Sequence, residues 1–140
     1  MRRLYAAIAI AACLGVALSV LGGCAPAGRA LDGTAWRLKS WSVNSVGPTD
    51  FRITARFDNG QVSGVSAVNT YGGGYTAGPD NAFLVGQLSS TLMAGPDAAN
   101  RAETAYMELL AEARSFKVEG DTLTLSDENG NVSLVFERSR

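Results

Sequence analysis

At its centre the chain reads Phe51-Arg52-Ile53-Thr54-Ala55-Arg56-Phe57-Asp58-Asn59-Gly60, and this stretch decides the fold. The first seven residues alternate apolar and polar side chains, which is the period of a strand with one buried and one solvated face. Asp58-Asn59-Gly60 is a strong hairpin signal, because Asn and Gly tolerate a positive φ. We therefore expect a strand over 51–57, a tight turn, and a returning strand over 61–68.

Further short strands are expected on both sides of this hairpin. Trp36 and Leu38 alternate with Arg37 and Lys39, which indicates a half-buried strand. Towards the C-terminus, Gly120-Asp121 is a two-residue hairpin signal. The remaining expected strands cover 75–77, 81–88, 115–119, 122–125 and 132–136.

One segment departs from the strand period. Apolar residues recur at intervals of three and four from Ala102 to Ala113, which is the stripe of an amphipathic helix. Pro96 and Asp97 suit its first turn, so the helix is expected at about 96–114. Its carboxylates are interpreted as a solvated face rather than an acid cluster: Glu103, Glu108 and Glu112. The expected class is α+β and β-dominated, an antiparallel curved sheet or small open barrel of seven or eight strands with this helix packed on it.

The segment Asn69-Thr70-Tyr71-Gly72-Gly73-Gly74-Tyr75 predicts a tight turn or a close backbone approach. One interpretation is a partner or ligand loop formed by Asn69, Tyr71, Gly73 and Tyr75. The other is structural: Asn69 caps a turn, the glycines allow strands to cross, and the tyrosines pack the core. The structural interpretation is favoured, since no Lys-Ser/Thr pair or strand-to-helix context makes this a phosphate loop.

The N-terminus has the pattern of a secretory leader. Arg2 and Arg3 precede 18 uncharged residues that end at Leu21. As a transmembrane anchor this run would barely cross the roughly 30 Å hydrocarbon layer. Leu21-Gly22-Gly23-Cys24 resembles the bacterial lipobox, which implies cleavage between Gly23 and Cys24 and a lipid on the Cys24 thiol.

The expected organisation is a leader over 1–23, a tether over 24–30 and one domain over 31–140. The lipid would hold the domain on a membrane of the cell envelope, and two or three acyl chains make such an anchor durable. Ala25, rather than Asp, follows the lipobox. This favours the outer membrane if the source is Gram-negative, and otherwise the outer face of the cytoplasmic membrane.

Composition narrows the function classes. Without the leader, the chain has 10 Lys and Arg and 13 Asp and Glu, a net charge of −3. The basic residues do not form the stripe that a nucleic-acid partner would need, so we expect no nucleic-acid binding. The chain has no His, the usual general base and commonest metal ligand. We expect no enzyme activity, catalytic residue, metal or cofactor. Asp127, Glu128, Asn129 and Asn131 are interpreted as a hairpin turn, since they lack the rest of a Ca²⁺ loop.

The domain resembles the META family, the HslJ-like lipoproteins, in four fragments that occur in family order. These are Leu31-Asp32-Gly33-Thr34-Ala35-Trp36, Asn69-x-Tyr71-x-Gly73-x-Tyr75, Thr91-x-Met93-Ala94, and Gly120-Asp121-x-Leu123-x-Leu125 followed by Gly130 and Phe136. The resemblance implies a non-enzymatic envelope domain, linked to stress, that binds a partner or stabilises the surface. The alternative is a lipid-tethered inhibitor or small-ligand carrier. The partner, an envelope protein or ligand, is not identified by the sequence.

The chain also departs from this family. Relatives often carry Gly-Cys-Asn at the centre and Met-Ala-Cys before the helix, where this chain has Ala67-Val68-Asn69 and Met93-Ala94-Gly95. Because both cysteine positions are lost together, we hypothesise that Val68 and Gly95 are neighbours and that apolar packing replaces a contact or bridge between cysteines.

Overall fold

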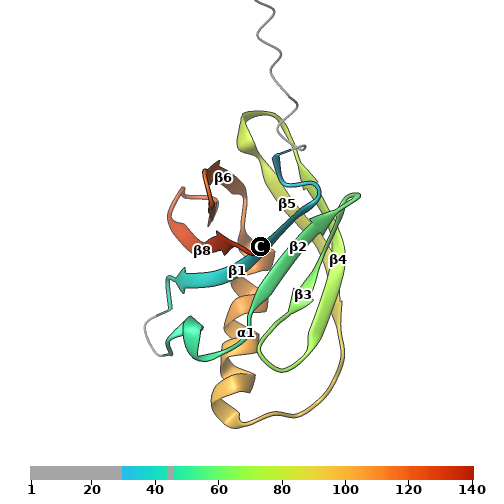
Figure 1. Ribbon diagram of the computed structural model, residues 1–140, viewed down its shortest axis with the longest axis vertical. Coiled ribbons are helices and arrows are strands. Elements are labelled where there is room, and N and C mark those ends of the chain that lie inside the picture. The colour runs from blue at the N-terminus through green and yellow to red at the C-terminus, as the bar shows by residue number, and fades with distance from the viewer. Residues whose placement is uncertain (1–29, 44–45) are drawn as a thin grey trace, which may run out of the picture.

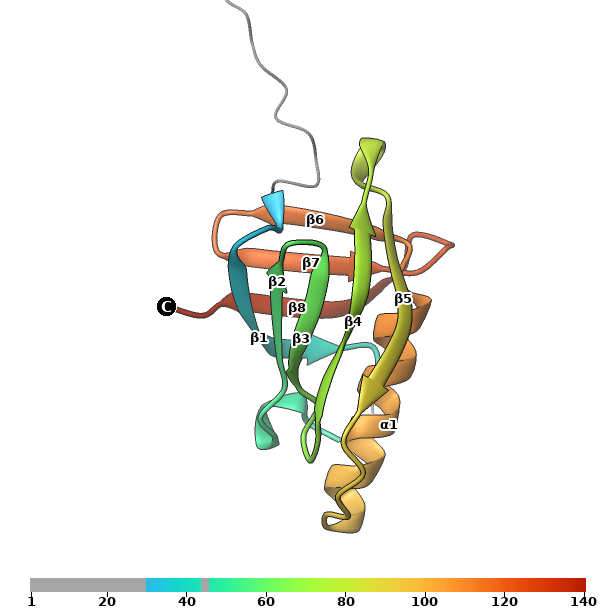
Figure 2. The same cartoon turned by 90° about the vertical axis from the view of Figure 1, so that its right-hand side faces the viewer.

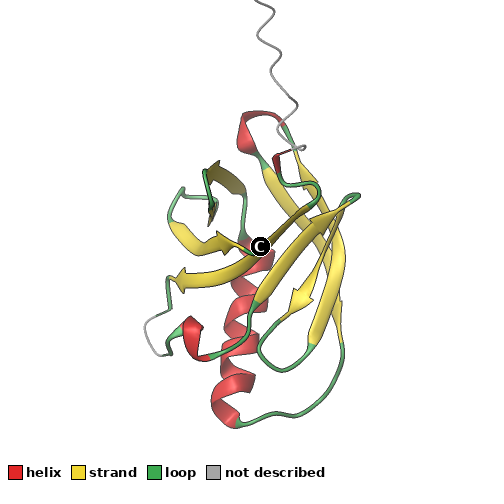
Figure 3. Cartoon of the chain, in the orientation of Figure 1, coloured by secondary structure: helices red, strands yellow, loops and turns green. Residues whose placement is uncertain are grey.

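The computed structural model describes residues 30–43 and 46–140 (Figure 1). The expected leader, the cleavage position at Gly23, the lipid attachment at Cys24 and the tether up to residue 29 lie outside the described residues. The described chain includes eight strands, one α-helix and the short 3-10 helices η2 and η3 (Figure 3). They run in the order β1 (Thr34–Trp41), η2 (Pro48–Asp50), β2 (Thr54–Asp58), β3 (Gln61–Val65), β4 (Thr70–Ala77), η3 (Pro79–Asn81), β5 (Phe83–Ser90), α1 (Asp97–Glu112), β6 (Ser115–Glu119), β7 (Thr122–Ser126) and β8 (Val132–Arg138).

The strands form one antiparallel sheet in the order β5-β4-β3-β2-β1-β8-β7-β6. The sheet curls so far that its two edges approach each other, and a single bridge between Ala82 and Ser115 links them. Figure 2 shows β6, β7 and β8 running across the direction of β2 to β5, with α1 beside β5. The expected class is confirmed: a strand-dominated α+β half-barrel with one helix.

The central hairpin forms where the sequence predicts it. Asn59 and Gly60 have φ angles of 50° and 75°, the left-handed values that a two-residue hairpin turn requires. The flanking strands are shorter than expected. Continuous pairing begins at Thr54, with Ile53 contributing an isolated bridge to Ser66, and β3 ends at Val65.

The expected return strand over 61–68 is wrong in its last three residues because the chain turns there. Ala67 has a φ of 85°, a conformation that disfavours an L side chain. Its N–H donates to the Arg52 carbonyl oxygen at 3.1 Å, and the Ser66 N–H donates to the Asn69 carbonyl oxygen at 2.8 Å. The turn leaves Asn69 buried, directly before the start of β4.

The glycine-rich segment after this turn is a strand rather than a turn. Thr70–Ala77 forms β4 and pairs with both β3 and β5. The expected close backbone approach is confirmed at Gly73, where an added Cβ would lie 2.6 Å from the Gln87 carbonyl oxygen. The same holds at Gly64 on β3, where an added Cβ would lie 2.0 Å from the Thr54 carbonyl oxygen.

The core lies inside the curl of the sheet and is closed by α1. The helix is confirmed over Asp97–Glu112, and it buries Ala102, Tyr106 and Leu110. Its Tyr106 ring packs edge-on against Phe136 of β8, with ring centroids 6.4 Å apart. Trp36 of β1 is fully buried. The helix and the two halves of the sheet thus share one core.

Candidate functional site

The structure places the four candidate loop residues in different surroundings. Tyr71 and Tyr75 are buried in the core, 4% and 8% exposed. The Tyr71 hydroxyl donates to the Thr54 carbonyl oxygen at 2.9 Å and lies 2.6 Å from the Tyr106 hydroxyl. Burial raises the pKa of Tyr71 and of Tyr106 above the ordinary value. Tyr75 packs against Phe57, with ring centroids 4.9 Å apart.

Asn69 is the candidate residue whose side chain connects two separate segments of the chain by hydrogen bonds. It is 3% exposed, and its side-chain amide reaches the segment between β5 and α1. Asn69 Oδ1 accepts from the Met93 N–H and the Thr91 hydroxyl, both at 2.8 Å. Asn69 Nδ2 donates to the Met93 carbonyl oxygen at 3.1 Å. Two fragments that lie 22 residues apart in sequence are therefore joined through one amide.

Glu103 of α1 holds Asn69 in place. Its Oε1 accepts from Asn69 Nδ2 at 2.8 Å, and its Oε2 accepts from the Asn69 N–H at 2.8 Å and the Ser66 hydroxyl at 2.7 Å. Partial burial raises the pKa of Glu103, but these hydrogen bonds outweigh burial and hold the pKa below its ordinary value. The interpretation of Glu103 as part of a solvated face is wrong, because its carboxylate lies against the turn before β4. We call these residues the Asn69 cluster: Ser66, Asn69, Thr91, Met93 and Glu103.

The Asn69 cluster supports an exposed apolar segment, residues 91–95, which we call the 91–95 loop. Leu92 is 97% exposed and Met93 is 63% exposed. Beyond Asn69, the loop is fixed at both ends. The Thr91 N–H donates to the Thr70 carbonyl oxygen at 3.0 Å, and Gly95 exchanges two hydrogen bonds with the Asn100 side chain, at 3.1 and 2.8 Å. A segment held this way presents its apolar side chains in one arrangement.

The 91–95 loop and the start of the domain lie at opposite ends of the molecule. In Figures 1 and 2, the first described residues lie beside the turn between β4 and β5 at one end. The segment that leads from β5 into α1 lies at the other end. The 91–95 loop therefore lies at the end of the body away from the first described residues.

Val68 and Gly95 are neighbours, as hypothesised. A Cβ added to Gly95 would lie 2.7 Å from Val68 Cγ2 and 3.1 Å from Val68 Cγ1. The isopropyl group of Val68 thus occupies the space that a side chain at position 95 would need. The contact joins the turn before β4 to the end of the 91–95 loop.

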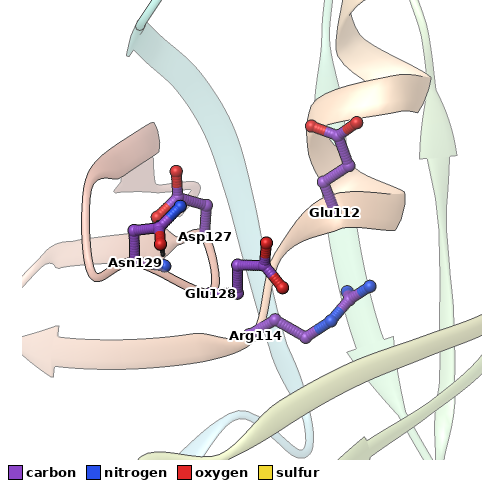
Figure 4. Close-up of a pocket in the computed structure, with 5 residues that line it drawn as sticks. All are labelled: Glu112, Arg114, Asp127, Glu128 and Asn129. Atoms are coloured by element: carbon purple, nitrogen blue, oxygen red, sulfur yellow. Dashed lines mark hydrogen bonds between the residues drawn. The ribbon is translucent and has the colours of Figure 1, made fainter.

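A charged depression of about 290 Å³ lies where α1 meets the turn between β7 and β8 (Figure 4). Arg114 Nη1 donates to the carbonyl oxygens of Ala111 and Ala113, both at 2.8 Å, which satisfies the end of the helix. Asp127 Oδ1 accepts from the N–H groups of Asn129 and Asn131, both at 2.9 Å. The Asn131 side chain is the main cause of a lowered Asp127 pKa. These bonds form the expected hairpin turn.

Residues 30–43 and 46–140 contain no group of three or more His, Cys, Asp or Glu side chains arranged to hold a metal ion. Within the same ranges, no helix combines the length and the apolar character needed to cross a membrane.

The architecture defines a class of protein: a curled antiparallel sheet closed by one helix, with a side-chain cluster that fixes the segment entering that helix. The model of the META domain family matches residues 29–140, and the chain belongs to this family. No curated protein matches the sequence. The expected family is confirmed, and the fold agrees with its solved relatives.

Three solved structures resemble the chain. An NMR structure of a protein from Burkholderia xenovorans is 25% identical, has a TM-score of 0.67, and the match covers 99% of each chain. A second NMR structure is 19% identical with a TM-score of 0.59, over 79% of this chain and 92% of the other. A DUF4847 family protein from Bacteroides vulgatus is 13% identical with a TM-score of 0.58, over 78% of this chain and 94% of the other. The latter two support the fold alone.

Sequence reasoning did not identify Leu92 or Glu103 as parts of a site. The sequence feature that could have pointed to this site is the fragment Thr91-x-Met93-Ala94. It contributes to the family resemblance but does not indicate a contact with Asn69. That contact depends on packing between β4 and the segment after β5, and no local pattern reveals it.

Proposed function

We infer that this chain is a lipid-anchored envelope protein whose META domain is a non-catalytic module that binds a protein partner. The observation that carries the binding part is the 91–95 loop: Leu92 and Met93 are exposed while a buried amide fixes their backbone. Two adjacent apolar side chains on an ordered segment offer apolar surface that a partner would bury, at little entropic cost to the loop.

The anchor rests on the sequence before the domain. Residues 25–30 separate Cys24, the last residue of the lipobox-like Leu21-Gly22-Gly23-Cys24, from Leu31, where the domain begins. Six extended residues span about 20 Å, so a lipid on Cys24 keeps the domain near the bilayer surface. With the 91–95 loop at the far end of the body, the binding surface faces away from the membrane.

The polar groups near the 91–95 loop support a binding role over catalysis. Both oxygens of Glu103 are occupied by hydrogen bonds within the cluster, and the Tyr71 hydroxyl is buried against Tyr106. A catalytic group needs a free position toward a substrate. These groups are instead used to hold the chain.

Anchoring is tested in the native host by intact-mass analysis and radiolabelled palmitate. We expect wild type to start at Cys24 with acyl groups, and Cys24→Ser to lose the label and remain unprocessed. Cys13→Ser is the matched control, because that thiol lies within the leader and its loss should change nothing. A wild-type chain that still starts at Met1, or an unacylated Cys24, would refute the anchor.

Partner binding is tested with a photocrosslinking amino acid at position 92 in the lipidated protein. We expect a discrete protein adduct that is absent when the crosslinker stands at Leu84, a 51% exposed leucine of β5. A further variant, Thr91→Val, removes one hydrogen bond to Asn69 and should weaken the adduct. Equal labelling from positions 84 and 92 would show that the 91–95 loop is not a binding site.

A further inference from the structure

We propose that the 91–95 loop is a substrate-like inhibitory loop for a serine endopeptidase, with Leu92 filling an apolar primary pocket. The inference rests on the proposed function, that the domain binds a protein partner through this loop. It adds the class of that partner and the chemistry of the contact.

Leu92 is exposed on an ordered support. Its side chain is 97% exposed, whereas the residues on both sides of it are hydrogen-bonded to β4 and Asn69. Binding a flexible loop costs the entropy of ordering it, and a loop that is already ordered avoids most of that cost. Leu92 is more exposed than its neighbour Met93, which is 63% exposed, and is therefore the side chain placed to fill a pocket.

The main-chain groups of the 91–95 loop alternate between bonded and free. The main-chain N–H groups of residues 91, 93 and 95 donate into the protein body. In the described chain, the main-chain groups of Leu92 and Ala94 make no hydrogen bond to the rest of the molecule. The loop therefore leaves the N–H and C=O groups of residues 92 and 94 free for hydrogen bonds with a partner's backbone, as in the recognition of a strand-like peptide.

The peptide bond between Leu92 and Met93 is the one that a peptidase with Leu92 in its primary pocket would attack. A serine peptidase would form a bond from its Ser Oγ to the Leu92 carbonyl carbon and break the bond from that carbon to the Met93 nitrogen. The Ser proton would pass through the peptidase's His to that nitrogen, which becomes the amine of the leaving segment. The reverse step consumes the same amine, returns the proton to Ser Oγ and restores the peptide bond.

Asn69 favours the reverse step. Its Oδ1 lies 2.8 Å from the Met93 nitrogen, and its Nδ2 donates to the Met93 carbonyl oxygen. Beyond Met93, Gly95 is tied to Asn100. The new amine would therefore stay beside the acyl group instead of leaving, so the peptidase would be held on the loop rather than turning it over.

The position of the loop favours this occupant over a lipid surface. The loop lies at the opposite end of the body from the first described residues (Figure 2), so an anchored domain would present it to soluble envelope proteins. A second copy of the chain is the remaining alternative occupant, and sedimentation of wild type and Leu92→Asp tests for it.

The test uses the full chain in detergent micelles and measures the inhibition of chymotrypsin and subtilisin, which accept apolar residues, on small chromogenic substrates. We expect 1:1 inhibition that Leu92→Asp weakens by roughly 30-fold or more. Leu92→Lys should transfer inhibition to trypsin, whose primary pocket takes a basic side chain. Leu84→Asp is the control and should inhibit like wild type.

A second measurement follows the loop itself. Intact mass should show slow cleavage between Leu92 and Met93 in wild type and faster cleavage in Thr91→Val, which weakens the support but leaves the core unchanged. Inhibition of neither peptidase, equal inhibition by Leu92→Asp, or rapid cleavage of wild type would each overturn the inference. The inference would also be overturned if wild type formed a dimer in sedimentation and Leu92→Asp abolished that dimer. The same holds if wild type bound phospholipid vesicles and Leu92→Asp abolished that binding. A crosslinked partner at position 92 without peptidase inhibition would leave the proposed function standing.

Discussion

The contact between Val68 and Gly95 predicts that a disulfide can be introduced there. The three atoms nearest to a Cβ added at Gly95 are the two Val68 methyl carbons and Asn100 Oδ1, the last at 3.5 Å. Val68 Cβ is not among them, so its distance from the added Cβ is at least 3.5 Å. Since Val68 Cγ2 lies 2.7 Å away, one C–C bond of about 1.5 Å places Val68 Cβ within about 4.2 Å. Disulfides have Cβ–Cβ distances of about 3.5–4.5 Å, so Val68→Cys with Gly95→Cys should form one.

The stabilisation follows from the loop that the bridge closes. Residues 68 to 95 make a loop of 28 residues, and constraining it in the unfolded chain is worth about 3.6 kcal/mol at 25 °C. For a domain of this size that corresponds to a rise of roughly 15 °C in the midpoint of thermal unfolding. The reference is the reduced double variant, which has the same side chains without the bond.

The bridge is identified by peptide mass mapping without reductant, and its effect by thermal melts with and without reductant. Each single cysteine variant is a control, and its midpoint should not depend on reductant. A double variant that forms no 68–95 bridge under mild oxidation would show that the two Cβ atoms are not placed as described. A bridge that lowers the midpoint would refute the estimate of the loop's contribution.

Three further predictions concern stability. Ala67→Gly should raise the free energy of unfolding by about 0.5–1 kcal/mol, because glycine relieves the positive φ at a smaller entropic cost, whereas Ala82→Gly at a φ of −60° should lower it; urea melts compare the two. Glu103→Gln should cost about 1–3 kcal/mol at pH 7, because the amide cannot accept every bond that the carboxylate accepts. Because folding lowers the Glu103 pKa, wild type is more stable than Glu103→Gln above about pH 4.3 and loses this extra stability as the pH falls through the folded pKa. Urea melts of both proteins at pH 7 and pH 3 would contradict this if their difference in free energy of unfolding were the same at both pH values. Gly64→Ala should cost about 3 kcal/mol or more through its backbone clash, while Gly74→Ala, with no atom nearer than 3.9 Å, should be nearly neutral in the same melts.

The parts of the fold that the sequence predicts are those set by neighbours along the chain. The turn at Asn59-Gly60 and the hairpin at Gly120 need only local backbone preferences, and both form as expected, with positive φ at Asn59, Gly60 and Gly120. The helix follows from a periodic stripe, and its ends differ from the expectation by one or two residues. Such signals survive because the packing of the rest of the domain agrees with them.

Long-range packing explains what the sequence did not reveal. The glycines of β4 look like a turn in the sequence, yet Gly73 is required because the Gln87 backbone of the next strand passes close to it. Glu103 has the spacing of a solvated residue on α1, yet the turn at Ala67 brings Ser66 and Asn69 against it. Neither contact can be recognised from a window of ten or fifteen residues, because each joins residues that are distant in the sequence or on different strands.

The Asn69 cluster also bears on why a polar group occupies this part of the domain. A buried amide and the partly buried carboxylate beside it need hydrogen-bond partners, and a well-packed apolar set of the same volume is often as stable. An apolar set, however, would not fix the backbone at Met93, because dispersion contacts do not select one hydrogen-bonding register. Asn69 binds both the N–H and the C=O of Met93 and so determines how Leu92 is presented. The polar cluster is therefore better explained by the positioning of the 91–95 loop than by stability alone.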